Sequence, residues 1–413
     1  MHIFAPVDTI QGRLQLVSSK SISNRALILE ALSGKPSVLH RLSEADDTQL
    51  LKSLLTQLEE HPHSTLHTQN CGTAFRFLTA LLSTRPGQWL LTGSERMKKR
   101  PIGPLVDALL HLGADIQYTE QRGFPPLQIK GKKLRGGSME LDANLSSQFA
   151  SALMMLGPTL PDGLEIRFPT KPNSYAYLEM TANLMQTFGA VVHLTNDCVS
   201  IPAGAYHSVD LTIESDWSAA SYYYELAALS ETADIFIEGL SQDTTQGDSR
   251  IASLMQHFGV ESEFSEEGVR IKKGQRDSIS AFACDLRDCP DLAPALFATC
   301  VGLGVSASFT GTSNLKIKES DRAVALALEL EKTGVCSFIV NDDSVFINQR
   351  KGTSPNASIT FNTHDDHRLA MAFAPLALRF SKLSIQNPEV VKKSYPNYWD
   401  DLSKLGFSYP FAD

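Results

Sequence analysis

A recurring helix-to-strand unit is the sequence feature that most limits how this chain can fold. Five times, an amphipathic run ends in a glycine and an extended, β-rich segment follows; these glycines are Gly113, Gly189, Gly259, Gly334 and Gly406. Glycine is common immediately after a helix because it adopts a positive φ without steric strain. Neighbouring glycines lie from 70 residues (259 after 189) to 76 residues (189 after 113) apart. A period this long indicates a repeated α/β module and not a solenoid turn.

The earliest copy of this unit is shorter than the others. The helix expected at residues 48–60 ends about twenty residues closer to Gly113 than the spacing of the other copies predicts. Residues 61–67 follow this helix directly, at the place where the other copies have strands. We therefore expect six modules of strands and helices, the first of which has lost a hairpin.

Three modules in each of two domains are the natural grouping for 413 residues, which are too many for one ordinary core. Because residues 3–17 precede the first module, we expect them to pair with the later half of the chain. The predicted domains are residues 1–19 with 215–413 (domain I) and residues 20–214 (domain II), of class α/β (α+β). Two connecting segments would allow the domains to hinge around a ligand in the cleft between them.

Charge and cysteine content exclude several classes of protein. The net charge of −9 argues against nucleic acid or an anionic membrane surface as partner. The six cysteines form no C-x-x-C pair, so neither structural zinc nor a disulfide frame is expected. The first ten residues lack the features of a signal peptide, and the longest apolar stretch, residues 292–309, is interrupted by proline and glycine. We expect a cytoplasmic protein.

The stretch Asn314-Leu-Lys-Ile-Lys-Glu-Ser-Asp-Arg322 precedes a helix expected at residues 323–330. On a helix, Lys318 and Arg322 would share one face, where like charges repel, and both lie at the end that the macrodipole makes unfavourable for cations. A bound phosphate or carboxylate would relieve both effects. Glu319 lies between them as a carboxylate able to move a proton. The alternative is a solvated first turn with a Glu319–Arg322 ion pair.

Similar clusters of charge recur along the chain. Eight basic residues are expected at or just before helix starts: Lys20, Arg25, Arg76, Arg100, Lys318, Arg322, Arg368 and Lys393. An ordinary capped helix explains any one of them, with Ser19 or Ser21 as the cap of the first helix and Thr73 as the cap of another. If helix starts from both domains converge on the cleft, these cations would bind a polyanion or two anionic substrates.

Polar residues open further helices. Asn144, Ser146, Ser147 and Gln148 precede a helix at residues 149–156, and Ser174 with Tyr177 begins another. Gly72 allows a close approach of the backbone before Arg76. Asp291 precedes a helix at residues 292–299, where helix capping is the simpler explanation for its carboxylate.

These motifs, in this order, resemble the 5-enolpyruvylshikimate-3-phosphate synthases, which are 3-phosphoshikimate 1-carboxyvinyltransferases. The shared motifs are SKSISNR, N-x-GT-x-x-R, RPIG, SSQ, S-x-x-Y, PD, N-x-x-x-KESDR, DDHR and KSYP. The resemblance covers almost the whole chain. It implies a two-domain inverse α/β barrel of six βαβαββ modules, a monomer, and chemistry that needs no cofactor and no metal.

The resemblance also implies roles for individual residues. Those for shikimate 3-phosphate are Lys20, Ser21, Arg25, Ser146, Ser147, Gln148, Ser174, Tyr177, Asp291, Asn314 and Lys318. Those for phosphoenolpyruvate are Lys20, Gly72, Arg76, Arg100, Gln148, Arg322, Arg368 and Lys393. Asp291 matches the family's proton acceptor and Glu319 its proton donor, with Lys20 a further candidate for proton transfer. The expected products are 5-enolpyruvylshikimate 3-phosphate and phosphate.

The chain departs from the family pattern in three places. The strand pair before the N-x-GT turn is missing, Val17 and Ser18 replace a Pro-Gly pair, and Phe77 stands where proline is frequent. One alternative is the related UDP-N-acetylglucosamine 1-carboxyvinyltransferase family, which has Lys-Asn near its start and a reactive loop cysteine. Here Ser21 follows Lys20, and residues 94–104 contain no cysteine. A second alternative is a binding protein without activity, against which the intact acid, base and cation positions argue.

Overall fold

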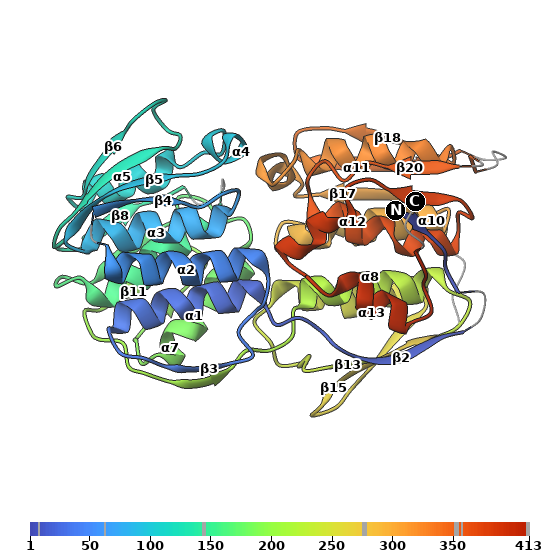
Figure 1. The fold of residues 1–413 in the computed structure, drawn as a ribbon, viewed down its shortest axis with the longest axis horizontal. Helices are drawn as coiled ribbons and strands as arrows, with labels where there is room; N and C mark the ends of the chain where they lie inside the picture. Colours follow the sequence, from blue (N-terminus) through green and yellow to red (C-terminus); the bar gives the residue numbers. More distant parts are fainter. Residues whose placement is uncertain are drawn as a thin grey trace. The chain divides into compact units, whose positions relative to one another are not determined.

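The computed structural model describes residues 1–6, 9–61, 63–142, 146–274, 279–350, 355–356 and 358–409. The chain divides into two compact units, drawn in Figure 1. Unit 1 comprises Met1–Ser18 with Glu214–Asp413, and unit 2 comprises Ser19–Ile213. Both are mixed α/β structures.

Unit 2 contains two four-stranded sheets with the same topology. In each, two parallel strands flank a helix, and an antiparallel hairpin follows a second helix. The first consists of β4 (His63–His67), α3 (Gly72–Thr84), β5 (Gly87–Thr92), α4 (Glu95–Lys98), α5 (Gly103–His111), β6 (Asp115–Tyr118) and β7 (Leu127–Gly131). The second consists of β8 (Gly137–Glu140), α6 (Ser147–Leu156), β9 (Leu164–Arg167), α7 (Tyr175–Thr187), β10 (His193–Leu194) and β11 (Cys198–Ile201).

The first segment of unit 2 is smaller. It contains α1 (Lys20–Ser33), β3 (Val38–His40) and α2 (Asp46–Glu60), and β3 pairs in parallel with β12 (Asp210–Thr212) in a two-stranded sheet. In Figure 1, α1, α2 and α3 lie side by side, and α1 contacts α2 as α2 contacts α3. This packing places the starts of three helices next to one another, where the side chains of the site begin.

Unit 1 repeats the same sheet order twice and adds a three-stranded sheet. The first sheet has β2 (Ile10–Gln15), α8 (Trp217–Leu229), β13 (Ala233–Glu238), α9 (Ile251–Leu254), β14 (Val260–Phe264) and β15 (Gly268–Lys273). The second has β16 (Ala281–Asp285), α10 (Ala293–Gly302), β17 (Ser306–Thr310), α11 (Arg322–Leu330), β18 (Cys336–Val340) and β19 (Ser344–Gln349). The third has β20 (Ile359–Phe361), α12 (His367–Phe373), β21 (Leu383–Ile385), α13 (Tyr398–Lys404) and β1 (His2–Ile3).

The opening residues of the chain pair with its later half. Strand β2 runs parallel to β13, and β1 runs antiparallel to β21. Helix α8 packs on β13 and β15, and α10 packs on β17 and β19; α8 is buried along its whole length. These two helices form the core of unit 1, because burying their apolar side chains supplies the main favourable free energy of folding.

The five repeated glycines have the backbone conformation expected from the sequence. Their φ angles are 92° at Gly113, 92° at Gly189, 74° at Gly259, 80° at Gly334 and 92° at Gly406. The prediction that each glycine ends a helical segment with positive φ is therefore confirmed.

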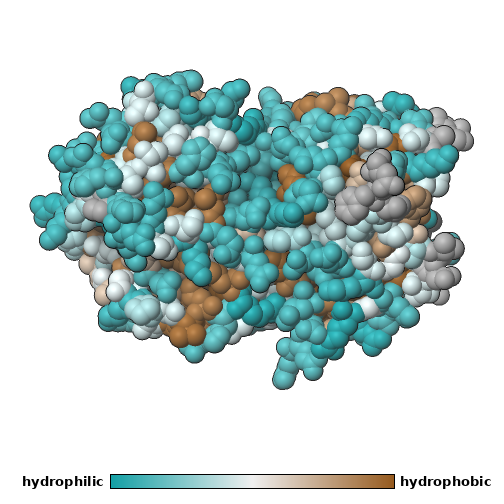
Figure 2. Space-filling model, in the orientation of Figure 1, coloured by the Kyte–Doolittle hydropathy of each residue, from teal (hydrophilic) through white to brown (hydrophobic). Residues whose placement is uncertain are grey.

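Hydrophilic side chains cover most of the face drawn in Figure 2, with smaller hydrophobic areas among them. Within the described ranges, no helix has both the length and the apolarity to span a bilayer.

Candidate functional site

The carboxylate of Asp291 lies among three cations in unit 1. Its Oδ1 accepts a hydrogen bond from Nη1 of Arg322 at 2.9 Å, and its Oδ2 accepts one from Nη2 of Arg368 at 2.8 Å. The ammonium of Lys318 lies 3.4 Å from Oδ1. Burial alone would raise the pKa of Asp291, but Arg368, Lys318 and Arg322 hold it well below its usual value. The group is therefore an ionised carboxylate at neutral pH.

The guanidinium of Arg322 is enclosed by carboxylates. Only 1% of its side chain is exposed. Its Nε and Nη2 donate to Asp366 at 2.9 and 3.3 Å, and Nη2 also donates to Glu319 at 3.1 Å. Burial lowers the pKa of Arg322, but the facing carboxylates of Asp366, Asp291 and Glu319 raise it by more. We infer that Arg322 is always charged and held in one orientation.

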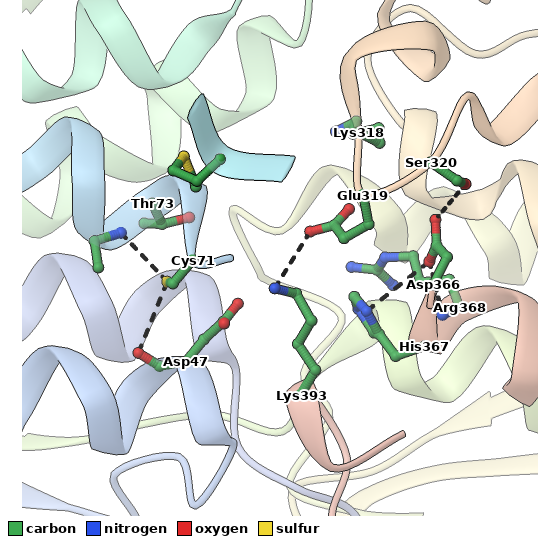
Figure 3. A network of polar contacts seen from close by, with 12 residues as sticks. Asp47, Cys71, Thr73, Lys318, Glu319, Ser320, Asp366, His367, Arg368 and Lys393 are labelled. Carbon is green, nitrogen blue, oxygen red and sulfur yellow. Dashed lines mark hydrogen bonds and ion pairs between the residues drawn. The ribbon is translucent and has the colours of Figure 1, made fainter. Parts of the chain in front are cut away.

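Glu319 lies between two cations. Its Oε2 accepts from Arg322, and its Oε1 lies 3.8 Å from the ammonium of Lys393, toward which it points in Figure 3. A carboxylate in this position has charged donors on two sides, which fix the orientation of its two oxygens. We call Asp291, Lys318, Glu319, Arg322, Asp366, Arg368 and Lys393 the Asp291 cluster.

The local structure around Lys318 corrects one sequence prediction. Helix α11 begins at Arg322 and is capped by Asp321, whose Oδ1 accepts from the backbone N of Val324 at 3.3 Å. Lys318 precedes the helix in an extended conformation, so the predicted repulsion along one helix face is wrong. The Glu319–Arg322 pair does form, but it is not a solvated pair, because only 1% of the Arg322 side chain and 11% of the Glu319 side chain are exposed.

Asp291 does not act as a helix cap. It lies in a 3-10 turn, Pro290–Leu292, and α10 begins after it without a side-chain cap. The capping explanation is therefore wrong, because the carboxylate faces the three cations instead.

In unit 2, Arg25 is held by hydroxyl groups from two other helices. Its Nε donates to Oγ1 of Thr181 at 2.7 Å, and its Nη2 donates to Oγ of Ser151 at 3.2 Å. The guanidinium also lies over the ring of Tyr177, 5.7 Å from its centroid, and Nη1 donates to the carbonyl of Ser21. Burial lowers the pKa of Arg25 to about 10, so the group remains charged at neutral pH.

Arg76 and Gln148 meet beside the start of α3. The Nη1 of Arg76 donates to Oε1 of Gln148 at 3.0 Å, and Nε2 of Gln148 donates to Oγ1 of Thr73 at 3.0 Å. A Cβ atom on Gly72 would lie 2.5 Å from Nη1 of Arg76 and 2.7 Å from both Nη atoms of Arg100. Only glycine therefore lets both guanidiniums approach this helix start, where backbone N–H groups also favour an anion. We call Gly72, Arg76, Arg100 and Gln148 the Arg76 cluster.

Lys20 is the first residue of α1 and pairs with Asp47. The distance from Nζ to Oδ2 is 2.9 Å, with 15% and 9% of the two side chains exposed. Asp47 lies in the first turn of α2, where the helix dipole stabilises a carboxylate. Its backbone carbonyl is 3.9 Å from the thiol of Cys71, as drawn in Figure 3. Lys20 is thus held in place by a residue that the sequence analysis did not identify.

The prediction that all eight cations stand at or just before helix starts is wrong for Arg25 and Arg76. Only Lys20, Arg322 and Arg368 lie in the first turn of a helix. Arg25 lies in the second turn of α1, because the helix begins five residues earlier and is capped by Ser19. Arg76 lies in the second turn of α3, Arg100 precedes α5, and Lys393 ends a 3-10 turn. In α3 the cap is Cys71 and not Thr73.

The remaining predicted residues lie close to these groups in sequence. Ser146 caps α6, accepting from the backbone N of Gln148 at 3.3 Å, and Ser147 is the first residue of that helix. Ser174 has a φ of 59° and makes no capping hydrogen bond to α7. Asn314 is buried in the 3-10 turn before Lys318. Asn144 lies outside the described residues.

Within the described part of the chain, no group of three or more His, Cys, Asp or Glu side chains is arranged to hold a metal ion. The fixed cations and carboxylates of these clusters can bind anionic groups and move protons.

Comparisons with known proteins agree with one another. Residues 4–402 match the family model described as EPSP synthase (3-phosphoshikimate 1-carboxyvinyltransferase). A 3-phosphoshikimate 1-carboxyvinyltransferase of Bacteroides fragilis (strain YCH46) is 44% identical over 409 residues, covering 98% of each chain. One of Aliivibrio fischeri (strain MJ11) is 33% identical over 428 residues, covering 97% of this chain and 98% of the relative.

A solved structure of an EPSP synthase from Acinetobacter baumannii has a TM-score of 0.77 to this chain, with 23% identity and 99% of each chain covered. At this identity the likeness shows the fold alone. It agrees with the mixed α/β architecture described above.

Proposed function

Because this chain belongs to the EPSP synthase (3-phosphoshikimate 1-carboxyvinyltransferase) family, we infer that its clusters of cations and carboxylates carry out that family's reaction. The chain is an enzyme of the shikimate pathway, which leads to the aromatic amino acids. It transfers the enolpyruvyl group of phosphoenolpyruvate to the 5-hydroxyl of shikimate 3-phosphate. The products are 5-enolpyruvylshikimate 3-phosphate and phosphate.

The reaction needs a base and an acid. The 5-hydroxyl loses its proton as its oxygen bonds to C2 of phosphoenolpyruvate, while C3 gains a proton and becomes a methyl group. The resulting tetrahedral intermediate then loses phosphate and one methyl proton, which restores the enol double bond. We assign Asp291 to the hydroxyl proton and Glu319 to the proton on C3, with Lys20 as a further proton-transfer group.

The ionised state of Asp291 supports its role and explains why it needs bound substrate. The three cations that hold its pKa low are also the groups proposed to bind the substrates' phosphate and carboxylate. When substrate anions offset those cations, the pKa of Asp291 rises toward its usual value. Asp291 thus becomes a stronger base only when there is a hydroxyl to deprotonate.

Residues of both units bind the two substrates in this proposal, and Lys20 and Gln148 contribute to both sets. Lys20, Ser21, Arg25, Ser146, Ser147, Gln148, Ser174, Tyr177, Asp291, Asn314 and Lys318 bind shikimate 3-phosphate. Lys20, Gly72, Arg76, Arg100, Gln148, Arg322, Arg368 and Lys393 bind phosphoenolpyruvate. Because each set takes residues from both units, we propose that the two domains close on the substrates and exclude water.

The observation that carries the proposal is the Asp291 cluster, in which an ionised carboxylate and a second carboxylate are held by the same buried arginine. The test is phosphate release on mixing both substrates, measured for the unmutated protein, Asp291→Ala and Glu319→Gln. Each substitution is expected to lower the rate about 10²–10⁴-fold.

Asp342→Asn is the matched control, since that carboxylate is fully exposed and pairs only at the surface with Lys316. It is expected to leave the rate unchanged. If the folded, unmutated protein releases no phosphate with both substrates present, the proposed function is wrong.

We further propose that the enzyme is a cytoplasmic monomer with six βαβαββ modules arranged as an inverse α/β barrel. The repeated sheet order and the two-stranded first sheet support this arrangement. Light scattering after size-exclusion chromatography tests the oligomeric state, with 45.2 kDa expected for the monomer and twice that mass as the contradicting result.

A further inference from the structure

Asp366 is a buried carboxylate to which the family resemblance assigns no role. None of its surface is exposed. Its Oδ2 accepts from Nε of Arg322 at 2.9 Å and from Oγ of Ser320 at 3.2 Å. Its Oδ1 accepts from Nη2 of Arg322 at 3.3 Å and from the backbone N of Arg368 at 3.0 Å. One carboxylate therefore contacts both arginines proposed to bind phosphoenolpyruvate.

These contacts hold the two arginines in different ways. For Arg322, Asp366 occupies the Nε side of the guanidinium and leaves Nη1 to Asp291. For Arg368, it caps the first turn of α12 and thereby fixes the backbone from which the side chain extends to Asp291. The start of α11 and the start of α12 are thus joined through a single side chain, seen beside Ser320 and Arg368 in Figure 3.

The turn directly before Asp366 has an unfavourable backbone conformation. His364 and Asp365 have φ angles of 50° and 56°, values that non-glycine residues seldom adopt. Such strain persists only where the surroundings fix the backbone, and it is concentrated at functional sites.

Glu329, a buried residue of α11, supplies that support. Its Oε2 accepts from the backbone N of Asn362 at 2.7 Å, and its Oε1 is 2.9 Å from Nε2 of His364. The backbone N of Asp366 itself donates to the carbonyl of Thr363 at 2.8 Å. Helix α11 therefore carries Arg322 at its start and, near its end, the group that fixes the turn before Asp366.

We propose that Asp366 is a positioning residue that sets Arg322 and Arg368 as a pair for the anionic groups of phosphoenolpyruvate. This inference rests on the proposed function. The cap alone does not need a charge, because asparagine and serine cap helices as well as aspartate does. The contact with Arg322 does need one, since a carboxylate offers two acceptors to the guanidinium while an amide offers one acceptor and turns a donor toward it.

Asp366→Asn separates the two tasks, because it keeps the cap and removes the charge. Steady-state kinetics are measured with each substrate varied, alongside circular dichroism to check folding. We expect the KM for phosphoenolpyruvate to rise 10- to 100-fold, with the KM for shikimate 3-phosphate changed less than threefold and kcat lowered less than the phosphoenolpyruvate KM is raised. Asp365→Asn makes the same chemical change on the exposed neighbouring residue and is expected to leave all three parameters unchanged.

Other outcomes overturn the proposal. An unchanged KM for phosphoenolpyruvate, or an equal rise in both KM values, would show that Asp366 does not position the arginine pair. If Asp366→Asn does not fold, Asp366→Ser provides a second variant with a cap and no charge, and the same kinetic result is expected. Failure of both to fold would assign Asp366 to folding alone. Turnover by the unmutated protein is established first, so failure of the proposed function is recognised separately.

Discussion

Replacing Asp291 by asparagine tests whether the Asp291 cluster is held together as described. The change keeps the shape of the side chain and removes the charge that faces Lys318, Arg322 and Arg368 at 3.4, 2.9 and 2.8 Å. Removing one partner of a buried ion pair costs about 3–5 kcal/mol of stability, because the other charges stay buried without compensation.

The lower end of that range is expected here. Arg322 keeps its contacts with Asp366 and Glu319, and 26% of the Lys318 side chain is exposed. A loss of about 3 kcal/mol lowers the melting temperature of a folded unit of 150–250 residues by about 6–12 °C. Differential scanning calorimetry at low salt measures the shift.

The effect of added phosphate on the melting temperature provides a second test. The uncompensated cations of Asp291→Asn form a better anion site than the intact cluster, so inorganic phosphate is expected to raise the melting temperature of the variant more than that of the unmutated protein. Asp342→Asn, on an exposed carboxylate, is expected to show neither effect. A variant as stable as the unmutated protein, with no larger response to phosphate, would show that Asp291 does not hold the three cations together.

Three further predictions follow from other contacts. Gly72→Ala places a methyl group against Arg76 and Arg100, so the KM for phosphoenolpyruvate is expected to rise about 10-fold with the KM for shikimate 3-phosphate unchanged. Arg25→Lys cannot reproduce the planar pair of donors to Thr181 and Ser151, so calorimetric affinity for shikimate 3-phosphate is expected to fall about 10- to 100-fold. Glu225→Gln is expected to stabilise the protein above pH 6. Both oxygens of the buried Glu225 carboxyl lack a hydrogen-bond partner among the described residues, and burial raises the pKa of this group well above its usual value. The folded state keeps this proton, whereas the unfolded state releases it near pH 4.5. The free energy of unfolding of the unmutated protein therefore falls by up to about 1.4 kcal/mol per pH unit above that value. Thermal melts of both proteins at pH 5 and pH 8 measure this loss.

Each of these predictions has a clear contrary result. Equal changes in both KM values for Gly72→Ala would place the disturbance in the fold and not in the phosphoenolpyruvate site. Full affinity of Arg25→Lys would show that charge alone suffices at that position. A Glu225→Gln variant with the same dependence of melting temperature on pH as the unmutated protein would show that Glu225 is not the protonated group.

The fold was predictable where residues act locally. The repeated glycines mark helix ends because the positive φ that follows a helix depends on the backbone of that one residue, and all five glycines have a positive φ. The first residue of a helix was harder to predict. Ser19 and Ser21 are equally good caps in sequence, and the choice of Ser19 moved Arg25 into the second turn.

The cations of the site were predictable from the sequence, but only some of its carboxylates were. Asp366 is visible in the DDHR motif, but its partner Arg322 is 44 residues away, and no local pattern joins them. Asp47 is a favourable residue for the first turn of a helix, so its pairing with Lys20 had no separate signal. Contacts between distant segments decide both cases, and these follow from packing and not from sequence spacing.

We propose that the cations of this chain bind two anionic small molecules that react with each other. Titration calorimetry of phosphoenolpyruvate into the protein, with and without saturating shikimate 3-phosphate, tests it most directly. We predict one phosphoenolpyruvate per chain, bound more tightly when shikimate 3-phosphate is present and weakened by Arg368→Ala. The absence of saturable phosphoenolpyruvate binding to the folded protein, with or without shikimate 3-phosphate, would show that these cations do not form a substrate site.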